Sequence, residues 1–207
     1  MDENLEKLVE KYCSDGDVDA LKSLVKNKQI DWNQKINGWS PLMIACRKSQ
    51  PGIVKFLLNE KTVDVNEDGM TPLYAACEEG HVEVVKLLLK HKKIEPNFYV
   101  RDMNPLHIAC QKGKVEVVKL LLKEPKVLVN TTTFGDDSTP LYLACDNGKL
   151  DVVKVLISDK RVDINCARAT AGTPLLISLR HGYSEITELI RQASKFLLFI
   201  YLFSYLF

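Results

Sequence analysis

The strongest constraint on the fold is a pair of landmarks that recur along the chain at a fixed separation. The first is a proline-centred block, present as SPLMIAC at 40–46, TPLYAAC at 71–77, NPLHIAC at 104–110, TPLYLAC at 139–145 and TPLLISL at 173–179. The second is an asparagine that closes the segments IDWN, VDVN, IEPN, VLVN and VDIN, at Asn33, Asn66, Asn97, Asn130 and Asn165.

The spacing of these landmarks separates packed structure from loops. From each of the first four prolines to the next asparagine the distance is 25 residues, whereas from each asparagine to the next proline it is 8, 6, 8, 10 or 9 residues. One inserted residue rotates the apolar face of a helix by roughly 100°. The constant stretch must therefore contain the packed elements, and the variable stretch must be a loop.

Within the constant stretch, the residue types predict a helix, a turn and a second helix. Proline suits the first helical position, after an N-cap of Ser, Thr or Asn; the expected caps are Ser40, Thr71, Asn104, Thr139 and Thr173. A glycine suits the left-handed C-terminus of the first helix; it stands at Gly80, Gly113, Gly148 and Gly182. The second helix, VEVVKLLL at 82–89 for example, has so broad an apolar stripe that neighbours must cover it on more than one side.

The same frame uncovers a divergent first repeat at residues about 4–33. Leu8 takes the proline position, 25 residues before Asn33, and Cys13 and Gly16 then take the cysteine and glycine positions. Its more polar residues are what a terminal repeat needs on its outer face.

At these residues the chain resembles the ankyrin repeat family, whose T-P-L-H-x-A signature has a period of about 33 residues. The resemblance implies an all-α solenoid of about six helix-turn-helix units with projecting β-hairpin-like fingers. Fingers and first helices form the usual concave binding face of such proteins. The expected domain is 1–194, with repeats at 4–35, 36–66, 67–97, 98–130, 131–165 and 166–193.

Two departures from the family pattern carry structural expectations. Only His107 keeps the histidine of the motif, so the Thr/Ser–His hydrogen-bond network is expected to be weakened. Ser49 stands at the glycine position of the second repeat and is followed by Gln50-Pro51-Gly52. We therefore expect an irregular turn before a helix at 53–59.

Composition argues against several functional classes. The 28 basic and 27 acidic residues leave a net charge of only +1, far from the basic excess that binds a nucleic-acid backbone. The start MDENLEKLVE lacks the pattern of a secretory signal, so we expect an intracellular, cytoplasmic protein. Equivalent cysteines of neighbouring repeats would be about 8–10 Å apart, too far for a disulfide, so they are interpreted as small buried core residues.

No catalytic, metal or cofactor site is expected, and no small-molecule substrate. The four histidines lie at different positions of the frame, without zinc-ligand or H-E-x-x-H spacing. His107 is interpreted as a structural partner of Asn104. The chain has no phosphate-binding glycine loop and no G-x-S-x-G motif. We expect a non-enzymatic scaffold for a protein partner, and an enzyme is the least favoured class.

The candidate binding residues are those that the repeat does not need for its own packing. They lie at the base of the fingers and at the ends of the first helices: Trp39, Arg47, Lys48, Met70, Glu78, Glu79, Met103, Gln111 and Lys112. A tryptophan flanked by methionines is typical of interface anchors. The alternative is that Trp39 and the methionines only pack finger against finger.

After Lys195 the chain reads FLLFIYLFSYLF, so residues 195–207 form a hydrophobic tail. As a helix these twelve apolar residues would span about 18 Å, less than the ~30 Å of a membrane core, so a membrane span is not expected. Three interpretations stay open: a segment folded back on the last repeat, a tether that makes the chain a membrane-bound adaptor, or the end of a fragment of a larger ankyrin-repeat protein. We favour the third.

Overall fold

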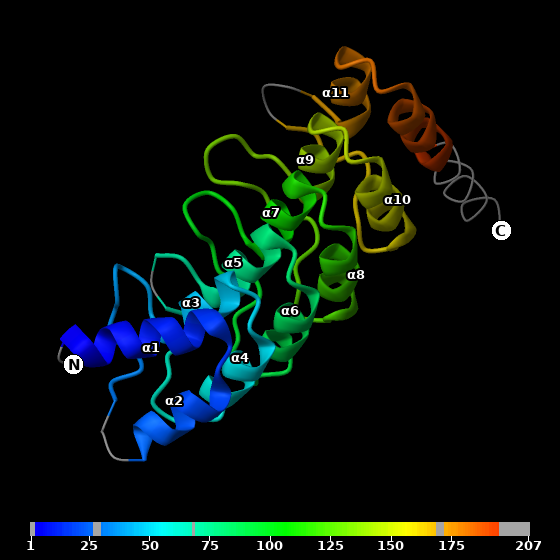
Figure 1. The fold of residues 1–207 in the computed structure, drawn as a ribbon. Helices are drawn as coiled ribbons and strands as arrows, with labels where there is room; N and C mark the ends of the chain where they lie inside the picture. The colour runs from blue at the N-terminus through cyan, green and yellow to red at the C-terminus, as the bar shows by residue number, and fades with distance from the viewer. Residues whose placement is uncertain (1–2, 27–29, 68, 169–171, 195–207) are drawn as a thin grey trace. The chain divides into compact units, whose positions relative to one another are not determined.

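The computed structural model describes residues 3–26, 30–67, 69–168 and 172–194, and all regular secondary structure within these ranges is helical. The helices are α1 (Glu3–Asp15), α2 (Val18–Val25), α3 (Pro41–Arg47), α4 (Pro51–Leu57), α5 (Pro72–Glu79), α6 (Val82–Leu89), α7 (Pro105–Lys112), α8 (Val115–Lys123), α9 (Pro140–Asp146), α10 (Leu150–Ser158) and α11 (Pro174–Arg180) (Figure 1). A further helical stretch covers residues 184–194.

The contacts divide the chain into two units, Met1–Arg101 and Asp102–Phe207. In unit 1, the first helices of three repeats pack side by side in the order α1, α3, α5, and the second helices pack in the order α2, α4, α6. In unit 2, the first helices follow the order α7, α9, α11, and α8 packs against α10. Each unit is thus two layers of helices, and the prediction of an all-α array of about six helix-turn-helix repeats is confirmed.

The frame extended back from Asn33 located the first repeat correctly. Helices α1 and α2 lie within the repeat that this frame located, with Cys13 and Leu21 fully buried, but α1 begins at Glu3, five residues before Leu8. Gly16, between the two helices, has a φ of 79°, which is the left-handed conformation expected at the glycine position. The repeat boundaries drawn from the sequence stay predictions.

The start signals of the first helices work as expected. In each case the side chain of the cap accepts a hydrogen bond from the backbone N–H three residues on, and proline begins the helix. The five caps are Ser40, Thr71, Asn104, Thr139 and Thr173. The glycines after these helices have φ between 65° and 86°, as the left-handed terminus requires: Gly80, Gly113, Gly148 and Gly182.

The turn of the second repeat corrects one expectation. Ser49 adopts the same left-handed conformation as the glycines, with φ of 55°, so the turn keeps the pattern of its neighbours. The helix after it begins at Pro51 and not at residue 53, because Pro51 takes the first helical position. The side chain of Gln50 reaches back to the preceding repeat and donates a hydrogen bond to the carbonyl of Ser14 at 2.7 Å.

Ser49→Gly should therefore stabilise the protein. A non-glycine residue in the left-handed region costs roughly 1 kcal/mol, which glycine avoids. We expect the free energy of unfolding in urea to rise by about 1 kcal/mol, less the extra entropy of glycine in the unfolded chain. Lys48→Gly is the matched control: Lys48 has a φ of −86°, so this substitution should lower stability. Equal changes in the two variants would contradict the conformational argument.

The first helices of the four inner repeats are buried along most of their length, which explains why they are small and apolar all round. All residues from 41 to 46 of α3 are buried, and so are those from 105 to 110 of α7. The cysteines at the shared position are free and fully buried: Cys13, Cys46, Cys77, Cys110 and Cys145. Burial raises the pKa of Cys13 to about 12, so this thiol stays protonated at neutral pH. The interpretation of these cysteines as core residues is confirmed.

Three of the landmark asparagines connect their repeat to the next. The side chain of Asn33 donates to the carbonyl of Thr62 at 2.7 Å and accepts from the N–H of Asp64 at 2.8 Å. The same two bonds join Asn66 to Lys93 and Glu95, and Asn130 to Arg161 and Asp163. The asparagine suits this place because its amide both donates to and accepts from one backbone loop, whereas a carboxylate can only accept.

Candidate protein-binding surface

The predicted binding residues fall into both units. Trp39, Arg47, Lys48, Met70, Glu78 and Glu79 belong to unit 1; Met103, Gln111 and Lys112 belong to unit 2. Each set is described by itself.

In unit 1, the finger between Asn33 and Pro41 presents Trp39 in a fixed position. The backbones of Ile36 and Trp39 exchange two hydrogen bonds, of 2.8 and 3.0 Å, across a two-residue turn. Asn37 and Gly38 in this turn have φ of 51° and 86°, the combination that a tight hairpin turn of the primed type requires. Asn37 also donates to a carboxylate oxygen of Glu10 on α1 at 3.0 Å. The turn of the finger is thereby held against the preceding repeat.

Arg47, at the end of α3, lies against the ring of Trp39. Its guanidinium carbon is 4.6 Å from the ring centroid, which is a cation–π contact. Trp39 is half-buried and Arg47 is exposed. The structure therefore brings together two predicted site residues from different elements, a finger and a first helix.

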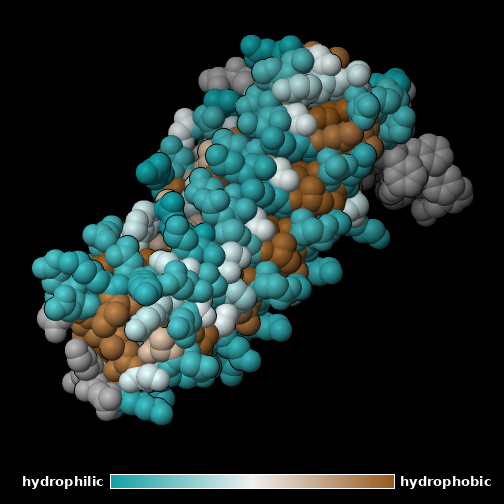
Figure 2. Space-filling view, in the orientation of Figure 1, coloured by the Kyte–Doolittle hydropathy of each residue, from teal (hydrophilic) through white to brown (hydrophobic). Residues whose placement is uncertain are grey.

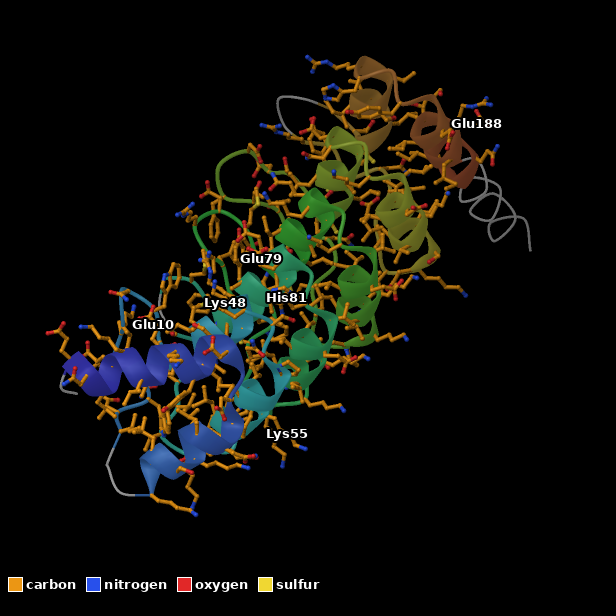
Figure 3. The ribbon with its side chains drawn as sticks, viewed as in Figure 1. Glu10, Lys48, Lys55, Glu79, His81 and Glu188 are labelled. Atoms are coloured by element: carbon orange, nitrogen blue, oxygen red, sulfur yellow. The ribbon has the colours of Figure 1, made fainter. Side chains whose placement is uncertain are left out.

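The ends of the first helices in unit 1 alternate in charge. Arg47 is the last residue of α3 and Lys48 follows it, and Glu78 and Glu79 end α5, which packs beside α3. Figure 3 shows Glu10, Lys48 and Glu79 in succession on α1, α3 and α5, while Lys55 projects from α4 in the other layer. A ligand that crosses this row meets acidic, basic and acidic side chains in turn.

Tyr74 lies beneath this row and was not singled out from the sequence. It is 7% exposed, and the base of its finger carries the half-buried Met70. Burial raises the pKa of the Tyr74 phenol and the charge of Glu78 raises it further, while Arg101 opposes them. The phenol therefore stays protonated at neutral pH. Its position, two residues after the repeat proline, is the signal by which it could have been found.

In unit 2, Met103 and Gln111 are half-buried and Lys112 is exposed, with no contact that joins them into a cluster among the described interactions. A different group comes together around Arg168. Its guanidinium lies 2.9 Å from a carboxylate oxygen of Asp136, in the longest finger, and 5.5 Å from the ring of Tyr142. Burial would raise the pKa of Asp136, but hydrogen bonds from Thr133 and Ser138 and the charge of Arg168 outweigh it and lower the pKa.

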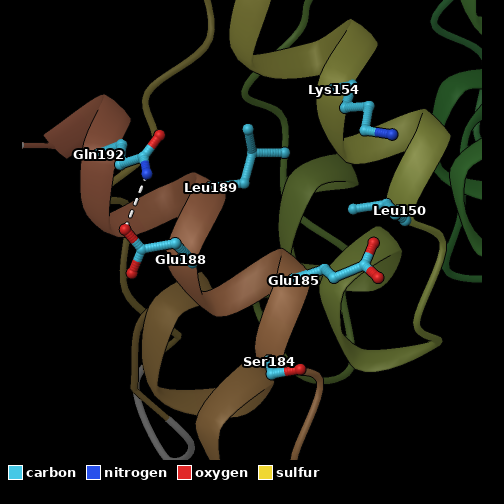
Figure 4. Close-up of a pocket in the computed structure, with 7 residues that line it drawn as sticks. All are labelled: Leu150, Lys154, Ser184, Glu185, Glu188, Leu189 and Gln192. Atoms are coloured by element: carbon cyan, nitrogen blue, oxygen red, sulfur yellow. Dashed lines mark hydrogen bonds between the residues drawn. The ribbon is translucent and has the colours of Figure 1, made fainter.

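The second-helix layer of unit 2 carries a shallow groove that the sequence did not suggest. It lies between α10 and the helical stretch 184–194, with Leu150 and Leu189 at its centre (Figure 4). Charged and polar side chains surround these leucines: Lys154, Ser184, Glu185, Glu188 and Gln192. In Figure 2 apolar atoms show over α8 and α10 between hydrophilic side chains. The broad apolar stripe of the second helices is thus covered only in part.

Three of the four histidines, His81, His107 and His181, are engaged in structural contacts at separate places. A ring nitrogen of His81 lies 3.0 Å from the carbonyl of Arg47, and one of His181 lies 2.9 Å from Asp146. His107 joins Asn104 and Thr131. In the part of the chain that the structure describes, no three His, Cys, Asp or Glu side chains are grouped so that they could hold a metal ion.

The expectation about a membrane span concerns the tail from Lys195 onward, which lies outside the described residues. Among the residues that are described, no helix has the length and apolar character needed to cross a bilayer.

Comparison with known protein families agrees with the two units. The family profile described as ankyrin repeats, in three copies, matches the chain twice, over residues 10–102 and residues 106–196. A comparison with curated proteins found no match. Ankyrin repeats are generally protein-binding modules and typically non-catalytic. Since the two matches cover most of the chain and the helix pairs, caps and linking asparagines fit them, the chain belongs to the ankyrin repeat family.

Proposed function

We propose that this chain is a non-enzymatic scaffold that binds a protein partner through the fingers and first helices of unit 1. The observation that carries the proposal is the contact between Trp39 and Arg47. Tryptophan and arginine are the residue types most enriched at the energetic centres of protein interfaces. Here the ring is half-buried and held in place, so binding would sacrifice little side-chain freedom.

In this proposal, the charged side chains at the ends of α3 and α5 determine which partner binds. Arg47 and Lys48 stand beside Glu78 and Glu79, so a partner with the complementary order of charges is favoured and one with the reverse order is repelled. Met70 adds an adaptable apolar contact at the base of the next finger. Met103, Gln111 and Lys112 would extend the same kind of surface in unit 2.

An intracellular location fits this proposal. All six cysteines are free, and five of them are buried core residues. Reduced cysteines used in this way are typical of proteins from reducing compartments.

The test is a capture experiment followed by an affinity measurement. Tagged wild-type protein and the variants Trp39→Ala, Met70→Ala and Lys55→Ala are used as bait in lysate, and the captured proteins are identified by quantitative mass spectrometry. With the partner purified, calorimetry should show at least a tenfold weaker Kd for Trp39→Ala, because loss of an interface anchor removes more than about 1.4 kcal/mol.

Lys55 is the matched control, since it is exposed on the second-helix layer of the same unit. Lys55→Ala should change the Kd less than twofold. Melting curves establish that each variant is folded. The proposal fails if Trp39→Ala binds like the wild type while Leu189→Asp, in the groove of Figure 4, abolishes binding.

A further inference from the structure

The turn of the finger between Asn33 and Pro41 carries an exposed asparagine followed directly by a glycine. Asn37 and Gly38 both face solvent, and a side-chain carbon added at Gly38 would meet no atom within 4 Å. Asparagine before glycine is the pair most prone to deamidation, because the glycine has no side chain to shield its backbone nitrogen. The chain contains a second such pair, Asn147 and Gly148, in a different setting.

Deamidation at such a pair proceeds through a ring. The backbone nitrogen of the glycine attacks the side-chain carbon Cγ of the asparagine, and a new N–C bond forms. The side-chain nitrogen leaves as ammonia and takes with it the proton of the glycine N–H. Water then opens the five-membered succinimide ring at either of its two carbonyl carbons. The product is aspartate or isoaspartate, each with a new carboxylate, and water is the only co-reactant.

The turn at Asn37 is one peptide rotation away from the backbone shape that this ring requires. The positive φ of both Asn37 and Gly38 defines a type I′ turn. Rotation of the peptide between them gives a type II′ turn, in which the first central residue has a ψ of about −120°. A succinimide fixes its residue close to this ψ. The rotation keeps the two hydrogen bonds between Ile36 and Trp39, and glycine adopts a negative φ as readily as a positive one.

The attacking nitrogen is unbonded in this turn and bonded at the other pair. Among the hydrogen bonds of the described residues, none uses the N–H of Gly38. The N–H of Gly148, by contrast, donates to the carbonyl of Cys145 at 3.2 Å. The side chain of Asn147 donates to the carbonyl of Leu143 at 2.9 Å. Ring closure at Asn147 therefore has to break both bonds and open the end of α9.

A carboxylate at position 37 would release the finger from α1. In the intact chain, the amide of Asn37 donates to a carboxylate oxygen of Glu10 at 3.0 Å. Aspartate and isoaspartate have no side-chain N–H to donate, and their charge would repel that of Glu10. Isoaspartate also leads the main chain through the side-chain carbon, which adds one atom to the turn between Ile36 and Trp39.

We propose that Asn37 is a site of spontaneous deamidation and that its conversion detaches the finger carrying Trp39 from α1. The exposed turn, the unbonded N–H of Gly38 and the contact with Glu10 together carry this proposal. No enzyme is needed, so the modified fraction increases with the age of the molecule. The finger of an old chain then differs from that of a new one by one negative charge.

The first test compares the two asparagine–glycine pairs within one folded chain. The full chain is kept at neutral pH in water enriched in heavy oxygen, and samples taken over several weeks are digested at acidic pH and mapped by mass spectrometry. Heavy oxygen enters the new carboxylate from water, so it separates this reaction from modification before the incubation. We expect Asn37 to react at least about tenfold faster than Asn147, where two hydrogen bonds must first break.

The same chain unfolded in urea is the control. Neither pair is then constrained, so Asn37 and Asn147 should react at similar rates. If Asn37 reacts no faster than Asn147 in the folded chain, the finger is not a preferred site and the proposal is wrong. A difference that is equally large in urea would assign the effect to the neighbouring sequence and would overturn the role of the turn.

The second test uses Asn37→Asp, which carries the aspartate product from the start. Aspartate before glycine suits the same turn, so the change is confined to the side chain. This variant should unfold at a lower urea concentration than the wild type, because repulsion replaces the hydrogen bond to Glu10. Adding Glu10→Gln should recover most of the loss, since the glutamine amide donates to the new carboxylate.

Glu10→Gln alone is the matched control for the double variant. Equal unfolding midpoints for Asn37→Asp and the wild type, or a double variant that recovers nothing, would show that the new carboxylate does not release the finger. None of these measurements uses a protein partner, so their outcome is independent of the proposed function.

Discussion

Lowering the pH from 7 to 4 should destabilise the protein by about 3 kcal/mol through His107 alone. Burial lowers the pKa of this imidazole from 6.5 to about 4, although hydrogen bonds to the backbone of Thr131 and Ser138 and the charge of Asp136 act in the opposite direction. The side chain is fully buried in unit 2. A shift of this size in pKa between folded and unfolded states corresponds to about 3 kcal/mol.

The hydrogen bonds explain why the ring must be neutral. Its Nδ1 accepts from the N–H of Asn104 at 3.2 Å, so Nε2 carries the proton and donates to the carbonyl of Thr131 at 2.8 Å. A second proton on Nδ1 would face the Asn104 N–H. Since the folded pKa lies below the unfolded one, the unfolded chain binds more protons between pH 6.5 and pH 4. The stabilisation is complete above pH 6.5, and it is lost as the pH falls through this window.

The measurement compares the wild type with His107→Tyr, which places at this position the residue of two other repeats, Tyr74 and Tyr142. Urea unfolding of both proteins at several pH values between 7 and 4 gives two stability profiles. Carboxylates common to both proteins largely cancel in the difference between the profiles. That difference should change by about 3 kcal/mol across the window. Parallel profiles would show that His107 does not titrate as its surroundings require.

Ser40→Ala should cost about 3 kcal/mol, more than the loss of an ordinary helix cap. The Ser40 hydroxyl accepts from the N–H of Met43 and donates to the carboxylate of Glu67, which is 8% exposed. Loss of a cap costs about 1 kcal/mol. A buried carboxylate left without its donor adds a further penalty of about 1–3 kcal/mol. Lys35, whose ammonium lies 3.5 Å from Glu67, limits this penalty.

Thr173→Ala is the comparison for this prediction, since Thr173 caps α11 at 3.3 Å with the same geometry and is half-buried. It should cost about 1 kcal/mol in the same urea titration. In a chain that already carries Glu67→Ala, the cost of Ser40→Ala should fall to a similar value. A cost of 3 kcal/mol that persists without Glu67 would place the effect in the cap and not in the carboxylate.

The fold was open to prediction because its signals are local and repeated. Three signals each reflect a requirement of the backbone within a few residues: a proline after a cap, a glycine eight residues later and an asparagine at a fixed distance. The turn at Ser49 was predicted wrongly because serine was assumed to break a pattern that the surrounding helices are able to impose. The surrounding helices hold Ser49 in the left-handed conformation although serine disfavours it.

The contacts between repeats were less accessible to sequence reasoning. Glu67 was overlooked because it follows the landmark asparagine in a loop, where residue type varies from repeat to repeat. Its partner Ser40 lies 27 residues earlier, and the same interval joins Asn104 to Thr131. Only the packing of one repeat on the next reveals that this interval brings two side chains into contact. The contact of Arg47 with Trp39, eight residues earlier in the same repeat, likewise joins two elements that single positions do not connect.

The linking asparagines have a consequence for how the chain acquires its structure. Each of their bonds joins residues 27–33 positions apart, and the helix contacts within each unit join consecutive repeats. Contacts between residues this close in sequence form with little conformational search. Folding can therefore begin in any repeat and spread to its neighbours. A ribosome-bound chain can therefore consolidate one repeat while the next is still being synthesised. Replacing one of these asparagines in the middle of a unit would remove its bonds to the next repeat, and folding would be interrupted between those two repeats.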